Sequence, residues 1–167
     1  MITLQQFTIL FQLILFFYEY IVWQVDIDNF TTHDHHAKLF GRNEYFFIVQ
    51  CNSIPHLFAA YSYYHQINWA MFLYIPYLLL FTLGQLFTWW IPYFFQIGLW
   101  HMNDGEKLDD YNKYHAHHHR ILPKFRDHPV IPDTEHTILG LLTLSTIFFT
   151  FMTWSRKIYR TSLKKKV

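Results

Sequence analysis

Long runs of apolar and aromatic residues, interrupted by blocks of charge, are the feature that most restricts how this chain can fold. Of its 167 residues, 52% are hydrophobic and 22% aromatic, whereas only 15% are charged, against about 25% in a soluble domain. About 20 apolar residues in a helix cover the roughly 30 Å hydrocarbon layer of a bilayer. The sequence therefore predicts a single-domain, all-α integral membrane protein with four transmembrane helices, at residues 2–25, 45–64, 69–90 and 137–154.

Three polar segments separate or follow these runs: residues 26–44, residues 101–136 and the basic tail 155–167. Because two spans lie between the first two segments, both are expected on the same side of the membrane. Clustered Lys and Arg beside a span favour the cytoplasmic side, so the tail predicts cytoplasmic termini and polar loops that face outward at the cell membrane. Lys164 and Lys165 also resemble a dilysine retrieval signal, which implies the endoplasmic reticulum as the alternative location.

Four polar side chains interrupt the predicted spans: Glu19, Asn52, His56 and Gln85. A polar group that faces lipid is costly, so these side chains should face other helices or water. Glu19 could reach the nearby headgroups, or it could be a buried ligand or proton carrier. Pro55 removes one backbone hydrogen bond and should bend the second span. This polar stretch is either a kinked helix that bonds its neighbours or a path in which His56 titrates.

The segment 101–136 holds seven of the twelve histidines. Asn103 or Asp104 can cap a helix, and Pro123 should stop it. Between them, residues recur at steps of three and four, which is the spacing of one helical face: Leu108, Tyr111, His115, His118 and Leu122. We therefore expect an amphipathic helix that lies at the membrane interface.

Histidines one helical turn apart can share a metal ion, and imidazole suits zinc, copper and iron. His115 with His118 or His119 has this spacing, and Asp110 offers a carboxylate beside them. The single cysteine excludes a cysteine-based cluster. The first polar loop adds three histidines on the same side: His33, His35 and His36. Two converging clusters predict an interfacial transition-metal site; the alternative is surface histidines paired with acids or headgroups.

Residues 115–119, with the sequence HAHHH, fit the pattern H-x-x-H-H. This resembles one histidine box of the membrane fatty-acid desaturase and hydroxylase families, whose boxes bind two irons. The resemblance covers five residues and implies iron as the metal and a lipid as the substrate. Those families carry several boxes, whereas the cluster at residues 33–36 is one position short and the chain has no further box.

Positive charge follows the histidine cluster, at Arg120, Lys124 and Arg126. These side chains could contact lipid phosphates or another anion, or they could pair with nearby acids. Asp133 precedes the fourth span where a helix N-cap belongs. We therefore expect the polar segment to end in this cap, which leaves His136 free to face the loop.

Small and hydroxyl residues share one face of the fourth span: Gly140, Thr143, Thr146, Thr150 and Thr153. Such a face is typical of close helix packing, and it offers a surface for a membrane-protein partner or a second copy of the chain.

The sequence leaves two functions open. One is a metal site, which could belong to a lipid-directed metalloenzyme. The other is a non-enzymatic protein that acts through helix contacts in assembly, immunity or accessory transport. A net charge of +1 predicts no nucleic-acid partner.

Overall fold

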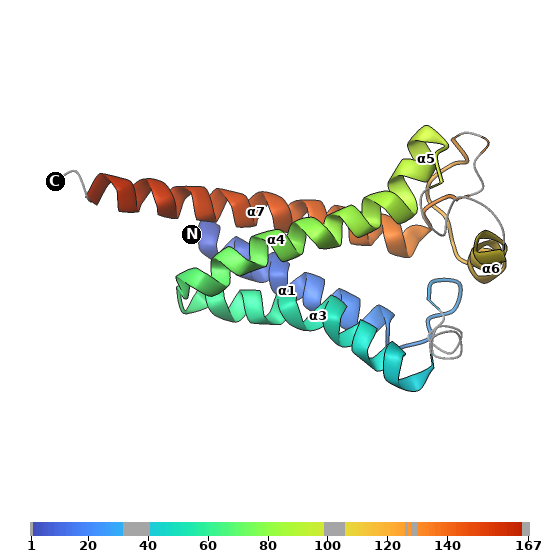
Figure 1. Cartoon of the computed structure of the whole chain (residues 1–167), viewed down its shortest axis with the longest axis horizontal. Helices are drawn as coiled ribbons and strands as arrows, with labels where there is room; N and C mark the ends of the chain where they lie inside the picture. The colour runs from blue at the N-terminus through green and yellow to red at the C-terminus, as the bar shows by residue number, and fades with distance from the viewer. Residues whose placement is uncertain (1, 32–40, 99–105, 126, 128–129, 165–167) are drawn as a thin grey trace.

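The computed structural model describes residues 2–31, 41–98, 106–125, 127 and 130–164. Within these ranges the regular secondary structure is entirely helical, which confirms the all-α prediction. Four long helices run alongside one another, as Figure 1 shows: α1 (Leu4–Val22), α3 (Arg42–Tyr64), α4 (Asn68–Gln85) and α7 (Thr134–Lys164).

The bundle buries many polar side chains and exposes large apolar ones. Buried polar side chains come from every long helix and include Thr8, Gln12, Ser53, His56, Gln85, Thr143 and Thr150. Large apolar side chains are exposed on the same helices, among them Phe17, Phe47, Leu80, Leu141 and Phe148. A soluble protein buries the apolar residues and exposes the polar ones, whereas lipid contact favours the arrangement seen here. The outer surface therefore suits a bilayer.

Among the residues that the structure describes, three helices are long and apolar enough to cross a membrane: Leu4–Val22, Asn68–Phe95 and Thr134–Tyr159. The predicted second span, at residues 45–64, is not confirmed. Its residues do form a helix of the right length, because α3 has 23 residues. The middle of α3 is too polar to reach the same hydropathy, since it contains Gln50, Asn52, Ser53 and His56.

The third apolar helix continues past residue 90, where the predicted span ends, and Pro92 does not break it. A π-helical turn, η1 (Leu86–Trp90), follows α4 and leads directly into α5 (Ile91–Phe95). In this turn the backbone N–H of Ile91 donates to the carbonyl of Leu86, five residues back. The wider turn accommodates Pro92, whose ring would clash with the fourth preceding carbonyl in a regular α-helix.

The polar middle of α3 bonds to α4. Pro55 has no N–H to donate to the carbonyl of Cys51, and the hydroxyl of Tyr77 donates to that carbonyl instead, at 3.0 Å. One residue further along, Nδ1 of His56 lies 2.8 Å from the hydroxyl of Tyr74. The tyrosines of α4 therefore satisfy groups that would be costly to expose to lipid.

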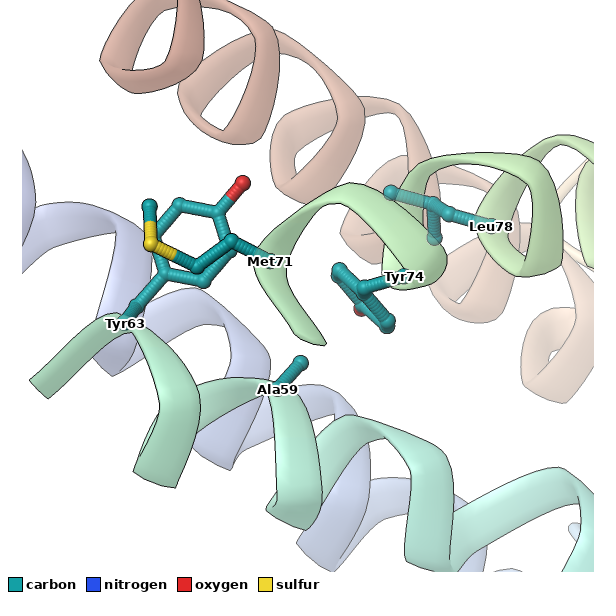
Figure 2. Packing of buried hydrophobic residues seen from close by; sticks show 5 residues of the cluster. All are labelled: Ala59, Tyr63, Met71, Tyr74 and Leu78. Atoms are coloured by element: carbon teal, nitrogen blue, oxygen red, sulfur yellow. The ribbon is translucent and has the colours of Figure 1, made fainter. Parts of the chain in front are cut away.

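The same two helices share a small apolar core. It consists of five buried residues, shown in Figure 2: Ala59, Tyr63, Met71, Tyr74 and Leu78. Tyr63 and Tyr74 bring hydroxyl groups into this core, so even the apolar contact between α3 and α4 carries polar atoms.

The small-residue face of α7 is covered within the chain. The hydroxyls of Thr8 and Thr153 lie 2.7 Å apart, between α1 and α7. At Gly140, an added Cβ would lie only 2.7 Å from Cζ2 of Trp90 in η1. The close packing that the sequence predicts is therefore present, but α1 and η1 occupy the face that was expected to be available to a partner.

The described parts of both polar segments lie at one end of the bundle, and the start of α1 and the end of α7 lie at the other (Figure 1). The backbone N–H of His119 donates to the carbonyl of Asn29 at 2.7 Å, which joins the segments and confirms that they share one end. The predicted amphipathic helix at the membrane interface is not confirmed. A helix, α6 (Glu106–His115), does form in this segment, but it ends before His118, whose N–H donates to the carbonyl of His115 in the following turn at 3.2 Å.

Candidate metal centre

Three imidazole rings converge on one carboxylate at the polar end of the bundle. Oδ2 of the fully buried Asp133 lies 2.8 Å from Nδ1 of His115 and 2.8 Å from Nδ1 of His118. The two Nδ1 atoms are themselves 3.2 Å apart. The second carboxylate oxygen, Oδ1, lies 2.7 Å from Nδ1 of His136. We refer to these four residues as the Asp133 cluster.

Asp133 holds its position because it caps α7. Its Oδ1 accepts a hydrogen bond from the backbone N–H of His136 at 2.9 Å, and its carbonyl accepts from the hydroxyl of Thr137 at 2.7 Å. A carboxylate at this position also benefits from the positive end of the helix dipole. The cap places His136 one turn along, beside the carboxylate, so one residue both starts the helix and gathers the imidazoles.

The other two histidines come from α6 and the turn behind it. His115 is the last residue of α6, and the reversal that follows brings His118 back to the same carboxylate. Nη2 of Arg120 donates to the carbonyl of His115 at 3.3 Å. This hydrogen bond links the chain just after the turn to the end of α6.

An apolar wall shields the Asp133 cluster from water. The indole of Trp89, from η1, stacks on His136 with ring centroids 3.6 Å apart, and it meets His115 edge-on at 5.2 Å. Trp89 also packs with Leu108 against the fully buried Val130. As a result, His115 and Asp133 are almost completely removed from solvent.

This burial sets the protonation states of the site. Burial lowers the pKa of His115 to about 3, although its contacts with Asp133 act in the opposite direction. Burial alone would raise the pKa of Asp133. The positive charge of a protonated His136 and the imidazole hydrogen bonds outweigh that effect and hold the Asp133 pKa well below its usual range. His115 as a neutral imidazole and Asp133 as a carboxylate have the forms that bind a metal ion, whereas a protonated His136 has to release its proton to become a ligand.

The cluster has the dimensions of a metal site. His115, Asp133 and His136 each offer one ligand atom, and these atoms lie within 4.8 Å of one another. His118 adds Nδ1, at 2.8 Å from Asp133 and 3.2 Å from His115. Ligand atoms about 2.0–2.1 Å from a tetrahedral zinc ion are roughly 3.3 Å apart. The group is therefore close enough to hold a metal ion.

Two further carboxylates lie behind the cluster, toward the interior of the bundle. Oε1 of Glu135 is 3.9 Å from Nε2 of His136, and the carbonyl of Glu135 accepts from the hydroxyl of Tyr18 at 2.7 Å. Glu19 is only 1% exposed, and its Oε2 accepts from the indole of Trp23 at 2.9 Å. Glu19 also interacts electrostatically with Glu135 and His136.

The structure brings together only part of the ligand set expected from the sequence. His115 and His118 belong to the cluster. The exposed His119 turns away, with Nδ1 at 2.7 Å from the hydroxyl of Thr134. Asp110 lies on α6, but its side chain is outside the described part of the chain. The same holds for three histidines of the first loop: His33, His35 and His36.

Asp133 and His136 were not expected as metal ligands. The spacing Asp-x-x-His was present in the sequence, but its acid was fully explained as an N-cap and its histidine was expected to face the loop. In the structure His136 instead lies between Asp133, Glu135 and the ring of Trp89. Of the five residues in the H-x-x-H-H pattern, only His115 and His118 reach the cluster, because His117 and His119 are exposed.

The other side chains singled out in the sequence do not belong to the Asp133 cluster. Arg120 contacts the carbonyl of His115, Lys124 is exposed, and Arg126 lies outside the described residues. Within the bundle, Nε2 of Gln85 donates to Thr143 at 2.9 Å. Asn52 is half-buried, and its carbonyl lies 3.3 Å from the hydroxyl of Tyr77, which can donate to it. Glu19 and His56 bond to Trp23 and Tyr74 as described above.

Comparison with known proteins gives no relative: no family model, no curated protein and no solved structure matches the chain.

Proposed function

We propose that this protein is a four-helix membrane protein that binds one transition-metal ion at the membrane surface, through His115, His118, Asp133 and His136. The observation that carries this proposal is the environment of Asp133, where one buried carboxylate meets three imidazole nitrogens within 2.8 Å. Imidazole with carboxylate is a donor set that suits zinc, and iron and copper also accept it.

The 3.2 Å separation of the two imidazole nitrogens is close to the roughly 3.3 Å expected between two ligands of one zinc ion, whereas each 2.8 Å contact with Asp133 also suits a hydrogen bond. Nδ1 of His115 and Nδ1 of His118 both approach the same oxygen of Asp133 and lie 3.2 Å from each other. If both nitrogens carry protons, the two N–H groups converge on one oxygen and face each other. A metal ion instead accepts one lone pair from each imidazole and one from the carboxylate. The apolar wall formed by Trp89 reduces competition from water.

We include α3 as a membrane span in this proposal, in addition to the three apolar helices. Its outer face is apolar, and five large side chains there are between 45% and 68% exposed: Phe46, Phe47, Phe58, Tyr61 and Tyr64. Its polar groups face α4, as the contacts of His56 and Cys51 show. A helix with this distribution can lie in lipid although its mean hydropathy is modest.

The test is the metal content of the purified protein and the change in its melting temperature when zinc, iron or copper is added. Asp133→Asn is the sharpest variant, because asparagine retains the N-cap but removes the charge. His115→Ala removes one imidazole. We expect one metal ion per wild-type chain, and loss of both the ion and the stabilisation in each variant.

The controls are His117→Ala and His119→Ala, which remove neighbouring exposed histidines and report nonspecific binding. They should bind as the wild type does. Wild-type stoichiometry in both Asp133→Asn and His115→Ala would overturn the proposal, and so would equal losses in the controls.

A further inference from the structure

Five titratable side chains form a row within the bundle, apart from the Asp133 cluster; four are buried and Tyr77 is half-buried. The row includes Tyr63 and His56 from α3, Tyr74 and Tyr77 from α4, and Glu19 from α1. Tyr63 and His56 are completely buried, and Glu19 is 1% exposed. Titratable groups inside a membrane are costly to keep and commonly mark a route for ions or protons.

Three of these side chains carry a buried polar atom with no hydrogen-bond partner among the described residues: Oη of Tyr63, Nε2 of His56 and Oε1 of Glu19. Oε1 of Gln12, on the interior face of α1, is a fourth such atom. An unsatisfied polar group in an apolar medium costs several kcal/mol. Ordered water is the usual partner of such groups.

Known contacts link the members of the row. The hydroxyl of Tyr74 lies 2.8 Å from Nδ1 of His56, and Tyr63 belongs to the same buried cluster as Tyr74 (Figure 2). The ring of Tyr77 is 5.5 Å from the ring of His56 and 5.9 Å from that of Tyr74. These contacts join the members on α3 and α4, whereas the step from Tyr77 to Glu19 on α1 has to be bridged by water.

The two ends of the row approach the two ends of the bundle. At the end where α1 begins and α7 ends, the carbonyl of Tyr63 accepts hydrogen bonds from the side-chain amides of Gln5 and Gln66, each at 2.9 Å. Gln66 is exposed. At the opposite end, Glu19 lies in the last turn of α1, where its Oε2 accepts a hydrogen bond from the indole of Trp23 at 2.9 Å.

We propose that these side chains, with water between them, form a proton path through the membrane between Tyr63 and Glu19. His56 takes up a proton at Nε2 and releases the one on Nδ1 to the hydroxyl oxygen of Tyr74, which passes its own proton on. Glu19 takes up a proton on one carboxylate oxygen and releases it to the next water. No electron moves, no bond other than those to hydrogen changes, and no metal ion takes part.

The test measures proton flux into vesicles that contain the purified full chain. A potassium gradient with valinomycin drives protons across the membrane, and an enclosed pH-sensitive dye reports their arrival. We expect wild-type protein to conduct protons well above the level of protein-free vesicles. Glu19→Gln, which retains the size and the acceptor for Trp23, should abolish this flux, and so should His56→Phe.

Two variants serve as matched controls. Glu19→Asp keeps a carboxyl group and should retain flux, which separates a lost proton carrier from a misfolded protein. Glu44→Gln neutralises an exposed acid in the first turn of α3 and should behave as the wild type. The proposal is overturned if wild-type vesicles resemble protein-free ones, or if Glu19→Gln and His56→Phe both conduct normally.

The metal content of every variant is measured in parallel, so the two proposals can fail separately. His56 bonds to Tyr74 inside the bundle and touches none of the Asp133 cluster in its known contacts. His56→Phe should therefore lose flux and keep its metal ion. Asp133→Asn should lose the metal ion, and any flux that it keeps shows that the path works without the metal.

Discussion

The indole ring of Trp89 lies on the imidazole ring of His136, with centroids 3.6 Å apart and planes inclined by 30°. The contact depends on the π-helical turn of η1, which also places the neighbouring Trp90 against Gly140 of α7. One distorted turn thus fixes two contacts with α7. The first closes the Asp133 cluster, and the second sets the approach of two membrane helices. Distortions of this kind occur often at functional sites.

Trp89 should report metal binding through its fluorescence. A paramagnetic ion such as Cu²⁺ quenches an indole that lies beside it, and Trp89 contacts both His136 and His115. We expect stoichiometric Cu²⁺ to quench part of the wild-type emission, and Trp89→Phe to lose that part. Trp154→Phe removes an indole that packs on Phe72 instead and should leave the quenching in place. Equal quenching in wild type and Trp89→Phe would place the bound ion elsewhere.

The hydrogen bond between Gln85 and Thr143 should contribute modestly to stability. The donor and acceptor are 2.9 Å apart, and both side chains are buried between α4 and α7. Side-chain hydrogen bonds between membrane helices contribute about 0.6 kcal/mol on average and up to about 1.7 kcal/mol. A double-mutant cycle with Gln85→Leu and Thr143→Val, measured as the free energy of unfolding in detergent, should give a coupling in that range. A coupling of zero would mean that the two side chains are satisfied separately.

Those parts of the fold that depend on local sequence could be predicted. Length and apolar composition decide whether a helix can cross the bilayer, so three spans follow from the sequence. The recurrence of small residues on the fourth span predicted a closely packed face. Periodicity could not show which element covers that face, because that depends on how α1 and η1 approach Gly140 and Thr153.

The site was predicted only in part, for a related reason. The acid Asp133 had a complete local explanation as an N-cap, and the cap is present in the structure. Its second role, as the centre of three imidazoles, arises only when α6 and the turn to His118 fold back on it. When a local role such as an N-cap already explains a residue, the sequence gives no sign that the residue also has a second role.

Chemical labelling should show that the two ends of the bundle lie on opposite sides of the membrane. Lys113 on α6 and Gln66 after α3 are both exposed, at opposite ends of the bundle. In a Cys51→Ser background, a cysteine introduced at one of these positions should react with an impermeant maleimide on intact cells, and a cysteine at the other should not. Both should react after permeabilisation. Equal reaction of both on intact cells would contradict a bundle that crosses the membrane end to end.

The two glycines of the apolar helices should respond in opposite ways to the same substitution. In Gly140→Ala the new methyl group would meet Cζ2 of Trp90 at 2.7 Å, so the indole or the helix must move. Overpacking of this kind costs about 1–3 kcal/mol, and a shift of Trp90 would also disturb the neighbouring Trp89. At Gly84 nothing lies within 4 Å of the added Cβ. Gly84→Ala should therefore be neutral or stabilise α4 by up to about 1 kcal/mol, because alanine favours the helix.

The free energy of unfolding in detergent measures both effects, and metal content measures the consequence for the Asp133 cluster. Gly140→Ala should lower stability and weaken metal retention together, since η1 links Trp90 to the wall of the site. Gly84→Ala should change neither for the worse. If Gly140→Ala were as stable as Gly84→Ala, then α7 would not pack against η1 as closely as the contact with Trp90 requires.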